Sequence, residues 1–403
     1  MNGKLAIEGG TKIFPDDFKF APWPPVRPET GDKLRELYLS AQWSYFGKYE
    51  VRFADGFAAY HDSKYGIFMA NGTTTLECAL KALGIGPGDE VIVPAWTWIA
   101  TGMAPVFAGA TAVFVDCEED TFCLDPEAFE AAITPKTRAV MPVHLFGSIA
   151  NLDAICAIAR KHHLAVVEDC AHAHGGKWNG KGVGSFGDIG SFSFQQSKIM
   201  TAGEGGLCTT NAPGLAEKIT RLKHIGNPGR KFDGKIPPAP GLLCHNYRAT
   251  EFQALILLDQ LQELDAASRY RAENAAYLRK GLESIPGIKA QKPGLKSTMQ
   301  SYYVFGIKID PAVLKPGKTK DEVIAAVAAE GAPEVFAGWG APVFRHKLWN
   351  VLPSSYRVAS SAVAEDIIAN KICLMGIQWL MSDKITLDRL IAAFAKVMKA
   401  YSK

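Results

Sequence analysis

The 403-residue sequence lacks the features that mark several large classes of protein. Its eight cysteines are scattered without a C-x-x-C pair, so neither a zinc site nor a disulfide framework is predicted. No uninterrupted apolar run approaches the roughly 20 residues of a membrane helix, and the first residues, MNGKLAIEGGTKIF, contain no apolar signal-peptide core. The net charge is only +3 without a long basic cluster, which disfavours nucleic acid and membranes as partners. These absences favour a cytoplasmic protein without a metal.

What the sequence contains is the composition of a globular protein, with 48% apolar and 21% charged residues. Its length predicts two or three domains. Apolar runs typical of strands, at 91–93, 112–115, 139–143 and 164–167, alternate with helical segments at 75–83, 97–107, 126–133 and 152–162. Apolar strands that alternate with helices indicate an α/β fold, with a mostly parallel sheet covered on both faces.

The remaining segments suggest how the chain is divided. Residues 1–30 are rich in proline and aromatic residues and are predicted to form an extended arm, and residues 227–243 are predicted to form an exposed loop. A long helix is expected from Thr250, ended by Pro286 and Gly287, and an amphipathic run follows at 387–401. We therefore expect a large domain at 1–255 and a smaller α/β domain at 256–403.

One lysine stands out in the stretch 190–206. Lys198 lies between an alternating apolar segment, 191–194, and a glycine-rich turn, 203–206. An amine held in such a place could serve Schiff-base chemistry with a carbonyl. A lone lysine is more often a solvated side chain at a strand end, so the surrounding motifs have to decide between the two interpretations.

Two stretches near strand ends suit a flat, anionic ligand. The run Gly72-Thr73-Thr74 opens a helix, where amide N–H groups and hydroxyls can bind an anion, although a simple N-cap is the alternative. Trp98 follows the strand at 91–93, beyond which ligands bind in open α/β sheets. Its ring could stack on a heterocycle or could belong to the core.

A third stretch supplies an acid. Asp169 ends an apolar strand, where a carboxylate needs a partner to stay charged, and it either caps the next turn or pairs with a protonated ring nitrogen. Ser193 could face the same anion as Thr73 and Thr74. A lysine amine, an acidic partner, an aromatic ring and a phosphate site together match pyridoxal 5'-phosphate.

Seven stretches between about residues 45 and 280 resemble, in order, the motifs of the DegT/StrS-type sugar and cyclitol aminotransferases: NGTTTLECAL, VIVPAWTWIAT, PVHLFG, VVEDCAHAHG, GDIGSFSFQQSK, TAGEGG and HNYRATEFQALILLDQLQELD. The resemblance implies an aspartate-aminotransferase-like fold with a mostly parallel seven-stranded sheet in the large domain. It also implies pyridoxal phosphate as cofactor, a smaller C-terminal domain, and a homodimer with active sites at the subunit interface.

The resemblance implies a role for each motif residue. Lys198 is similar to the Schiff-base lysine and Asp169 to the partner of the pyridinium nitrogen. Trp98 would stack on the ring, with His172 near the ring hydroxyl. Phosphate binding falls to Gly72, Thr73, Thr74 and Ser193, and to Asn246 from the neighbouring subunit. The expected reaction is ping-pong transamination in aminosugar or antibiotic biosynthesis.

The substrates are less well defined by the motifs. The spelling QQSK at 195–198 and the helix ILLDQLQELD resemble cyclitol enzymes that take the amino group from L-glutamine, with L-glutamate as the other donor. Residues 336–339 with Phe344-Arg345 instead resemble 3-amino-5-hydroxybenzoate synthases, and both groups carry a His-His pair where this chain has Cys373-Leu374-Met375-Gly376. A keto-cyclitol of the scyllo-inosose type is the favoured acceptor, and a nucleotide-linked keto sugar or an aminoshikimate-type ring are the alternatives.

Four residues are candidates for the acceptor pocket, with surface or packing roles as the alternative: His144, Trp339, Arg345 and His346. Relatives that dehydrate sugars carry histidine in place of the lysine, which Lys198 argues against. A non-enzymatic regulator that binds pyridoxal phosphate is a further alternative.

Two motifs point away from other cofactors. The run 182–187 spells G-x-G-x-x-G, but it follows an Asn179-Gly180 hairpin turn rather than an apolar strand, which disfavours a dinucleotide site. The histidines at 162, 163, 172 and 174 have no acidic or cysteine partner at metal-binding spacing.

Overall fold

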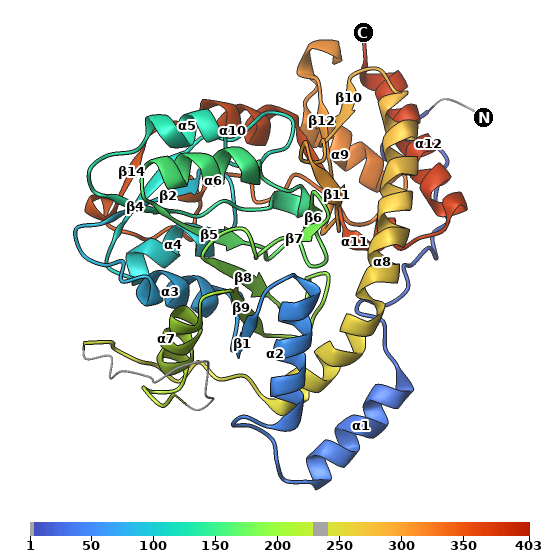
Figure 1. Ribbon diagram of the computed structural model, residues 1–403. Coiled ribbons are helices and arrows are strands. Elements are labelled where there is room, and N and C mark those ends of the chain that lie inside the picture. The colour runs from blue at the N-terminus through green and yellow to red at the C-terminus, as the bar shows by residue number, and fades with distance from the viewer. Residues whose placement is uncertain (1–3, 229–240) are drawn as a thin grey trace.

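The computed structural model describes residues 4–228 and 241–403 and confirms the α/β fold (Figure 1). Most of the loop expected at 227–243 lies outside the described residues. The largest sheet has eight strands, in the order β1 (Tyr65–Met69), β9 (Gly206–Thr210), β8 (Ile189–Ser193), β5 (Ala165–Asp169), β4 (Thr137–Val140), β2 (Glu90–Pro94), β3 (Thr111–Val115) and β14 (Tyr356–Val358). All neighbours from β8 to β14 pair in parallel, whereas β9 runs antiparallel to β8 and β1.

Seven of the eight strands come from residues 65–210, as expected for the large domain, and the eighth is added from the C-terminal part of the chain. Three residues near the C-terminus, Tyr356 to Val358, pair in parallel with Ala112 to Phe114 at the edge of the sheet. An isolated three-residue strand carries too short a pattern to be recognised in the sequence. Its pairing also places a segment from the C-terminal third of the chain beside the N-terminal sheet (Figure 1).

Helices connect the strands where the periodicity predicts them. They are α3 (Gly72–Ala82), α4 (Ile99–Phe107), α5 (Pro126–Ala131) and α6 (Leu152–Lys161). Strand β8 shows how the two faces differ. Phe192 and Phe194 pack with Phe53 and Phe57 of α2 (Lys48–Tyr60), whereas Ser191 bonds to Thr75 of α3 at 2.7 Å between hydroxyls. The functional site lies at the end of β8, on this second face of the sheet.

A smaller antiparallel sheet lies beside the first and has the order β10 (Ile288–Ala290), β12 (Phe305–Ile309), β15 (Ile372–Met375) and β13 (Val335–Phe336). It packs with α9 (Lys320–Ala329) and α12 (Lys384–Tyr401), the latter covering the expected amphipathic run. The division at residue 255 stays a prediction. The N-terminal Leu5 and Phe14 are buried in this second core, so the arm crosses that boundary.

Helix α8 (Glu251–Glu283) joins the two cores (Figure 1). It begins after Thr250 and ends before Pro286, as expected, and Thr250 caps it in a capping box with Gln253. Leu257 packs in a core beside the large sheet, and Leu278 packs in the core of the smaller sheet. The helix therefore belongs to both parts of the molecule.

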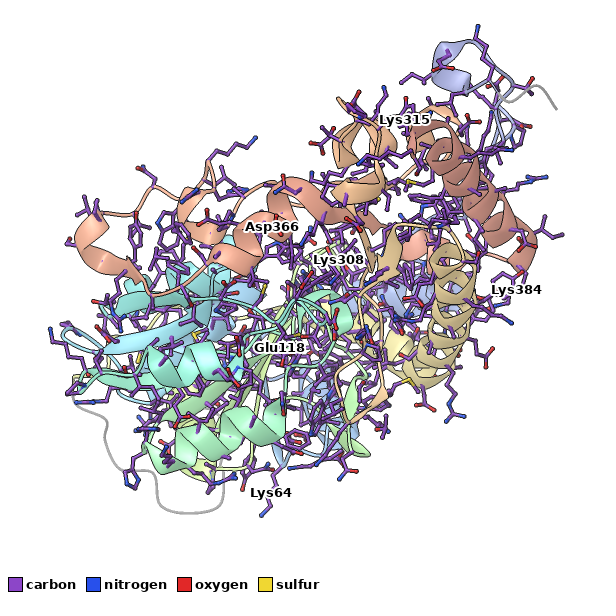
Figure 2. The ribbon with its side chains drawn as sticks, turned by 90° about the horizontal axis from the view of Figure 1, so that it is seen from above. Lys64, Glu118, Lys308, Lys315, Asp366 and Lys384 are labelled. Atoms are coloured by element: carbon purple, nitrogen blue, oxygen red, sulfur yellow. The ribbon has the colours of Figure 1, made fainter. Side chains whose placement is uncertain are left out.

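Ion pairs bridge the two sheets. In Figure 2, Lys308 of β12 lies near the loop that carries Glu118, and its Nζ is 3.3 Å from Glu119 and 3.2 Å from Asp120. Residues 177–182 form a hairpin, β6 (Lys177–Trp178) and β7 (Lys181–Gly182), whose turn residues Asn179 and Gly180 have positive φ as the sequence predicts. Among the described residues, no helix is both long and apolar enough to cross a membrane.

Candidate active site

A cavity of about 1030 Å³ lies at the carboxyl ends of the parallel strands, where ligands bind in open α/β sheets. The structure brings together in its lining nine of the residues that the motifs single out: Gly72, Thr73, Thr74, Trp98, Asp169, His172, Ser193, Lys198 and Trp339. These come from the ends of β5 and β8, the starts of α3 and α4, and the loop after β13. Segments far apart in sequence therefore share one site.

Lys198 sits in a turn just after β8, in which its amide donates to the Gln195 carbonyl at 2.8 Å. The side chain is half-buried, and Nζ lies 4.5 Å from the centre of the Tyr303 ring. Burial lowers the pKa of Lys198 to about 8, although the charge of Asp169 acts in the opposite direction. An appreciable fraction of the amine is therefore neutral, and nucleophilic, near neutral pH.

Asp169 lies at the end of β5 and is almost fully buried. Its Oδ2 accepts a hydrogen bond from Thr101 Oγ1 at 2.9 Å, and Oδ1 accepts one from the Ala171 amide at 3.1 Å. Burial raises the pKa of Asp169 in spite of these two bonds and of the charge of Lys198. Among the described residues no cation forms a salt bridge with it, so a ligand cation placed here would stabilise the carboxylate.

The surroundings of His172 determine both the charge of its ring and the nitrogen that carries the proton. The Phe146 amide donates to Nδ1 at 3.3 Å, so the neutral ring carries its proton on Nε2. Burial, with the nearby Lys198 and His174, holds the pKa of His172 well below its ordinary value and keeps the ring neutral. The Nε2–H group is therefore a hydrogen-bond donor at the cavity.

Tyr303 is a cavity residue that the motifs do not reveal. Its ring stacks on His172 with centroids 4.2 Å apart, and its hydroxyl lies 2.8 Å from Ser197 Oγ. Thr101 is likewise recognised only from the structure, in which its hydroxyl donates to Asp169. The sequence shows Tyr303 only as an aromatic residue before the apolar run of β12, a pattern that usually means packing.

The first turn of α3 forms an anion cradle. Asn71 is the N-cap, with Oδ1 accepting from the Thr74 amide at 3.0 Å, and Thr74 Oγ1 donates back to the Asn71 carbonyl at 2.8 Å. Among the described residues, the amides of Gly72 and Thr73 have no acceptor. A Cβ added to Gly72 would lie 2.6 Å from Ser193 Cβ, so glycine lets the helix start approach β8. The unpaired amides and the helix dipole attract an anion.

Two tryptophans border the cavity. Trp98 precedes α4, is 41% exposed, and its ring centroid lies 5.8 Å from that of Trp339. An exposed tryptophan beside a cavity offers a face for a flat ligand, whereas the neighbouring Trp96 is buried in the core.

Four of the predicted residues do not line the cavity. The His144 ring is fully buried, accepts from the Ala150 amide through Nδ1 at 3.2 Å, and lies 3.3 Å from a Glu168 oxygen. The exposed guanidinium of Arg345 pairs with Glu365 at 2.9 Å. His346 approaches Trp98 at 6.1 Å between ring centroids, and Asn246 lies between the lining residues His245 and Tyr247. The roles assigned to these four stay predictions.

The G-x-G-x-x-G run binds a carboxylate of the chain itself. The amides of Gly184, Phe186 and Gly187 donate to the two oxygens of Glu168 at 2.8–2.9 Å. Glu168 also lies close to His144 and Cys170. The atoms of these three residues that could bind a metal lie within 4.8 Å of one another. The oxygens of Glu168 already accept three hydrogen bonds, and burial holds the Cys170 thiol pKa well above its ordinary value.

Comparisons with known proteins agree with this geometry. The sequence model of the "DegT/DnrJ/EryC1/StrS aminotransferase family" matches residues 26–394. An L-glutamine:2-deoxy-scyllo-inosose aminotransferase of Streptoalloteichus tenebrarius is 40% identical over 342 residues, which span 80% of this chain and 78% of that protein. The enzyme of the same description from Micromonospora echinospora is 35% identical over 98% of this chain and 97% of its own length. The crystal structure of 3-amino-5-hydroxybenzoic acid synthase has a TM-score of 0.81 at 30% identity, covering 95% of this chain and 99% of that one.

Proposed function

The chain belongs to the DegT/DnrJ/EryC1/StrS aminotransferase family, and from that premise we propose that it uses pyridoxal 5'-phosphate to transfer an amino group from L-glutamine or L-glutamate to a keto-cyclitol of the scyllo-inosose type. One observation carries the proposal. The amine of Lys198, with its lowered pKa, shares a cavity with a buried carboxylate and a helix start, and within the described part of the chain neither of these has a partner of opposite charge.

The residues present fit this cofactor. The free amides of Gly72 and Thr73 and the hydroxyl of Ser193 would hold its phosphate, and Trp98 would stack on its ring. Asp169 would face the ring nitrogen, and the Nε2–H of His172 would donate to the ring hydroxyl. When bound, pyridoxal phosphate supplies an electron sink for the charge left on carbon after proton removal.

The chain itself would then move one proton. With a pKa of about 8, the amine of Lys198 is suited to take the proton from Cα of the amino donor and to return it to the former aldehyde carbon of the cofactor, on the other side of the amino nitrogen. The buried carboxylate of Asp169 would keep the ring nitrogen protonated, since removing that proton would leave an unpaired charge in the core. The stacked ring of Tyr303 restricts the directions from which Nζ can approach.

The charges of the cavity support a cyclitol rather than a nucleotide-linked sugar. Among the described residues that line the cavity, the lysine and arginine side chains are those of Lys198 and Lys81. The Nζ atom of Lys81 already pairs with Glu77 at 2.5 Å. A diphosphate normally requires several cationic or bidentate partners. Neutral polar groups at Gln195, Ser197 and Tyr303 suit the hydroxyls of an uncharged ring.

A donor and acceptor screen tests the proposal. We expect amine formation on scyllo-inosose with L-glutamine or L-glutamate, followed by mass spectrometry, and slower or no reaction with nucleotide-linked keto sugars and aminoshikimate-type ketones. Borohydride treatment followed by peptide mapping should place the cofactor on Lys198, and Lys198→Ala should lose this label. A protein that binds the cofactor but converts no donor would support the regulatory alternative, and a label on another residue would refute the assignment of Lys198.

The predicted homodimer with a shared site has its own test. If Asn246 serves the partner's site, a hybrid of Lys198→Ala and Asn246→Ala subunits contains one intact site. Mixing the two inactive variants should then restore activity. If Asn246 acts within its own subunit, both sites of the hybrid stay damaged and no activity returns.

A further inference from the structure

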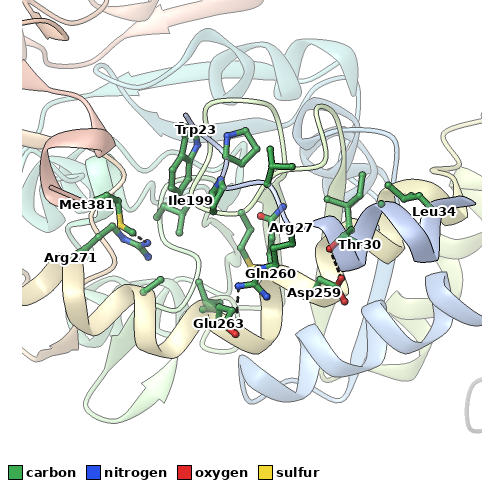
Figure 3. Close-up of a pocket in the computed structure, with 18 residues that line it drawn as sticks. Trp23, Arg27, Thr30, Leu34, Ile199, Asp259, Gln260, Glu263, Arg271 and Met381 are labelled. Carbon is green, nitrogen blue, oxygen red and sulfur yellow. Dashed lines mark hydrogen bonds and ion pairs between the residues drawn. The ribbon is translucent and has the colours of Figure 1, made fainter. Parts of the chain in front are cut away.

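A second cavity, of about 290 Å³, lies between the N-terminal arm, α1 (Pro28–Leu39) and α8 (Figure 3). This volume is close to the lower end of the range for small-molecule sites. Most of its wall is apolar, and the residues that matter below are Trp23, Pro25, Ile199, Met200, Leu264 and Met381. None of these lines the first cavity.

A buried cation faces this space. Arg271 of α8 is 1% exposed, and its Nε donates to the Ser301 carbonyl at 2.7 Å and its Nη2 to Ser268 Oγ at 3.0 Å. Its Nη1 lies 3.9 Å from the sulfur of Met381, and a thioether sulfur is a poor hydrogen-bond acceptor. Burial lowers the pKa of Arg271 to about 10, so the group stays charged at neutral pH.

Among the described residues, no carboxylate pairs with Arg271. The group that interacts with its charge is the Tyr60 hydroxyl, and burial raises the pKa of Tyr60 to about 12, so that hydroxyl is neutral. Buried arginines are normally paired, because an isolated buried charge is costly. An anion that enters from the cavity would remove this imbalance.

The lining contains a second donor. The Nε1 atom of Trp23 is buried and has no partner within the described part of the chain. Figure 3 shows Met381 and Arg271 together at the left of the cavity, Trp23 above them, and Asp259 on the opposite side. The acids of the lining are already engaged, Asp259 with Lys33 at 2.9 Å and Glu263 with Arg27 at 3.5 Å.

We propose that this second cavity is a binding site for a small carboxylate with an apolar body. Its carboxylate would pair with Arg271 and accept from Trp23, and its apolar body would lie against Ile199, Met200 and Leu264. This site stands independently of the proposed transamination, since none of its residues takes part in that reaction.

The site shares a wall with the loop that follows Lys198. Ile199 and Met200 are the next two residues, and Gln260 of α8 holds Thr201 by two hydrogen bonds, accepting from its amide at 2.8 Å and donating to its carbonyl at 2.6 Å. A carboxylate in the cavity therefore contacts a segment that is fixed both to α8 and to Lys198.

Fluorine NMR with 4-fluorobenzoate tests this on the full-length protein loaded with pyridoxal phosphate, with neutral 4-fluorobenzamide as the matched probe. We expect the acid to bind at least tenfold more tightly than the amide. Arg271→Met should weaken binding of the acid at least tenfold and Trp23→Phe about threefold, whereas Arg269→Met, at an exposed position of the same helix, should change nothing.

The outcomes separate clearly. Equal binding of acid and amide, or unchanged binding in Trp23→Phe together with Arg271→Met, would overturn the proposal. If Arg271→Met does not fold, the comparison of the two probes and the Trp23→Phe variant still decide. Displacement of the probe by the amino donor L-glutamine would place the probe in the first cavity and would also overturn the proposal.

Discussion

Two adjacent carboxylates at the end of β5, Glu168 and Asp169, show how differently one strand can treat the same chemical group. Both are almost completely buried. Burial alone would raise the pKa of Glu168, but His144 and the amides of the 184–187 turn outweigh it and lower that pKa. Asp169 has two donors, Thr101 and the Ala171 amide, and burial raises its pKa.

The difference separates a structural from a functional acid. Successive side chains of a strand point to opposite faces, so Glu168 meets the tight turn after β7 while Asp169 meets the cavity. The turn and His144 together satisfy Glu168, and the amides of the turn fix the loop to the sheet. The cavity leaves Asp169 short of partners, which is the state in which a buried acid attracts a cationic ligand group.

The strongest test removes the charge of the functional acid. Asp169→Asn keeps the size of the side chain, and we expect kcat/KM for transamination to fall about 10³-fold because the ring nitrogen loses its anionic partner. Thermal unfolding should change little. A variant that retains full activity would show that Asp169 does not face the ring.

The matched change in the structural acid should do the opposite. In Glu168→Gln, one of the two oxygens that accept hydrogen bonds from backbone amides is replaced by an NH2 group. We therefore expect the free energy of unfolding to fall by about 3 kcal/mol in urea titrations. Since the folded pKa of Glu168 lies below its unfolded value of 4.5, its contribution is present above pH 4.5 and is lost as the pH falls towards the folded pKa. The variant should lose this acid dependence. Activity per folded molecule should stay near that of the parent.

The pH dependence of cofactor attachment tests the link between Asp169 and Lys198. The neutral amine reacts with aldehydes, so the attachment rate to cofactor-free protein should rise about tenfold from pH 7 to 9 and then level off, because the pKa of Lys198 is about 8. Absorbance in the near-violet follows the reaction. In Asp169→Asn the midpoint should move to lower pH, since the charge that raises the lysine pKa is gone; an unmoved midpoint would contradict the coupling.

The smallest expected effect concerns Thr101. Thr101→Val removes one of the two donors to Asp169, and the loss of one hydrogen bond of about 1 kcal/mol should lower kcat/KM about fivefold. Thr97→Val is the control, because Thr97 contacts Thr101 at 2.9 Å but does not donate to Asp169. Equal effects of the two changes would attribute the loss to packing.

The sequence revealed most of the fold and the parts of the site that lie within local motifs. Lys198, Asp169 and the start of α3 are each defined by the strand or helix end beside them, so their shared cavity follows from the parallel sheet. The pairing of β14 with β3 joins segments more than 240 residues apart, and no local pattern encodes it.

Tyr303 and His144 show the same limit in opposite directions. Tyr303 lies just before β12 of the smaller sheet, and it reaches the cavity only through tertiary packing. Histidine is a common active-site residue, but the ring of His144 lies against Glu168 and not in the cavity. Whether a polar side chain meets a cavity or a neighbour depends on backbone positions that its own sequence does not specify.

The length of α8 has a consequence for dissecting this protein. At about 1.5 Å per residue its 33 residues extend about 50 Å, and it carries side chains of both cores as well as the clamp on Thr201. A cut anywhere along this rod would expose apolar surface on both fragments. The two lobes are therefore expected to melt as a single cooperative unit, and neither should survive as a separately expressed piece.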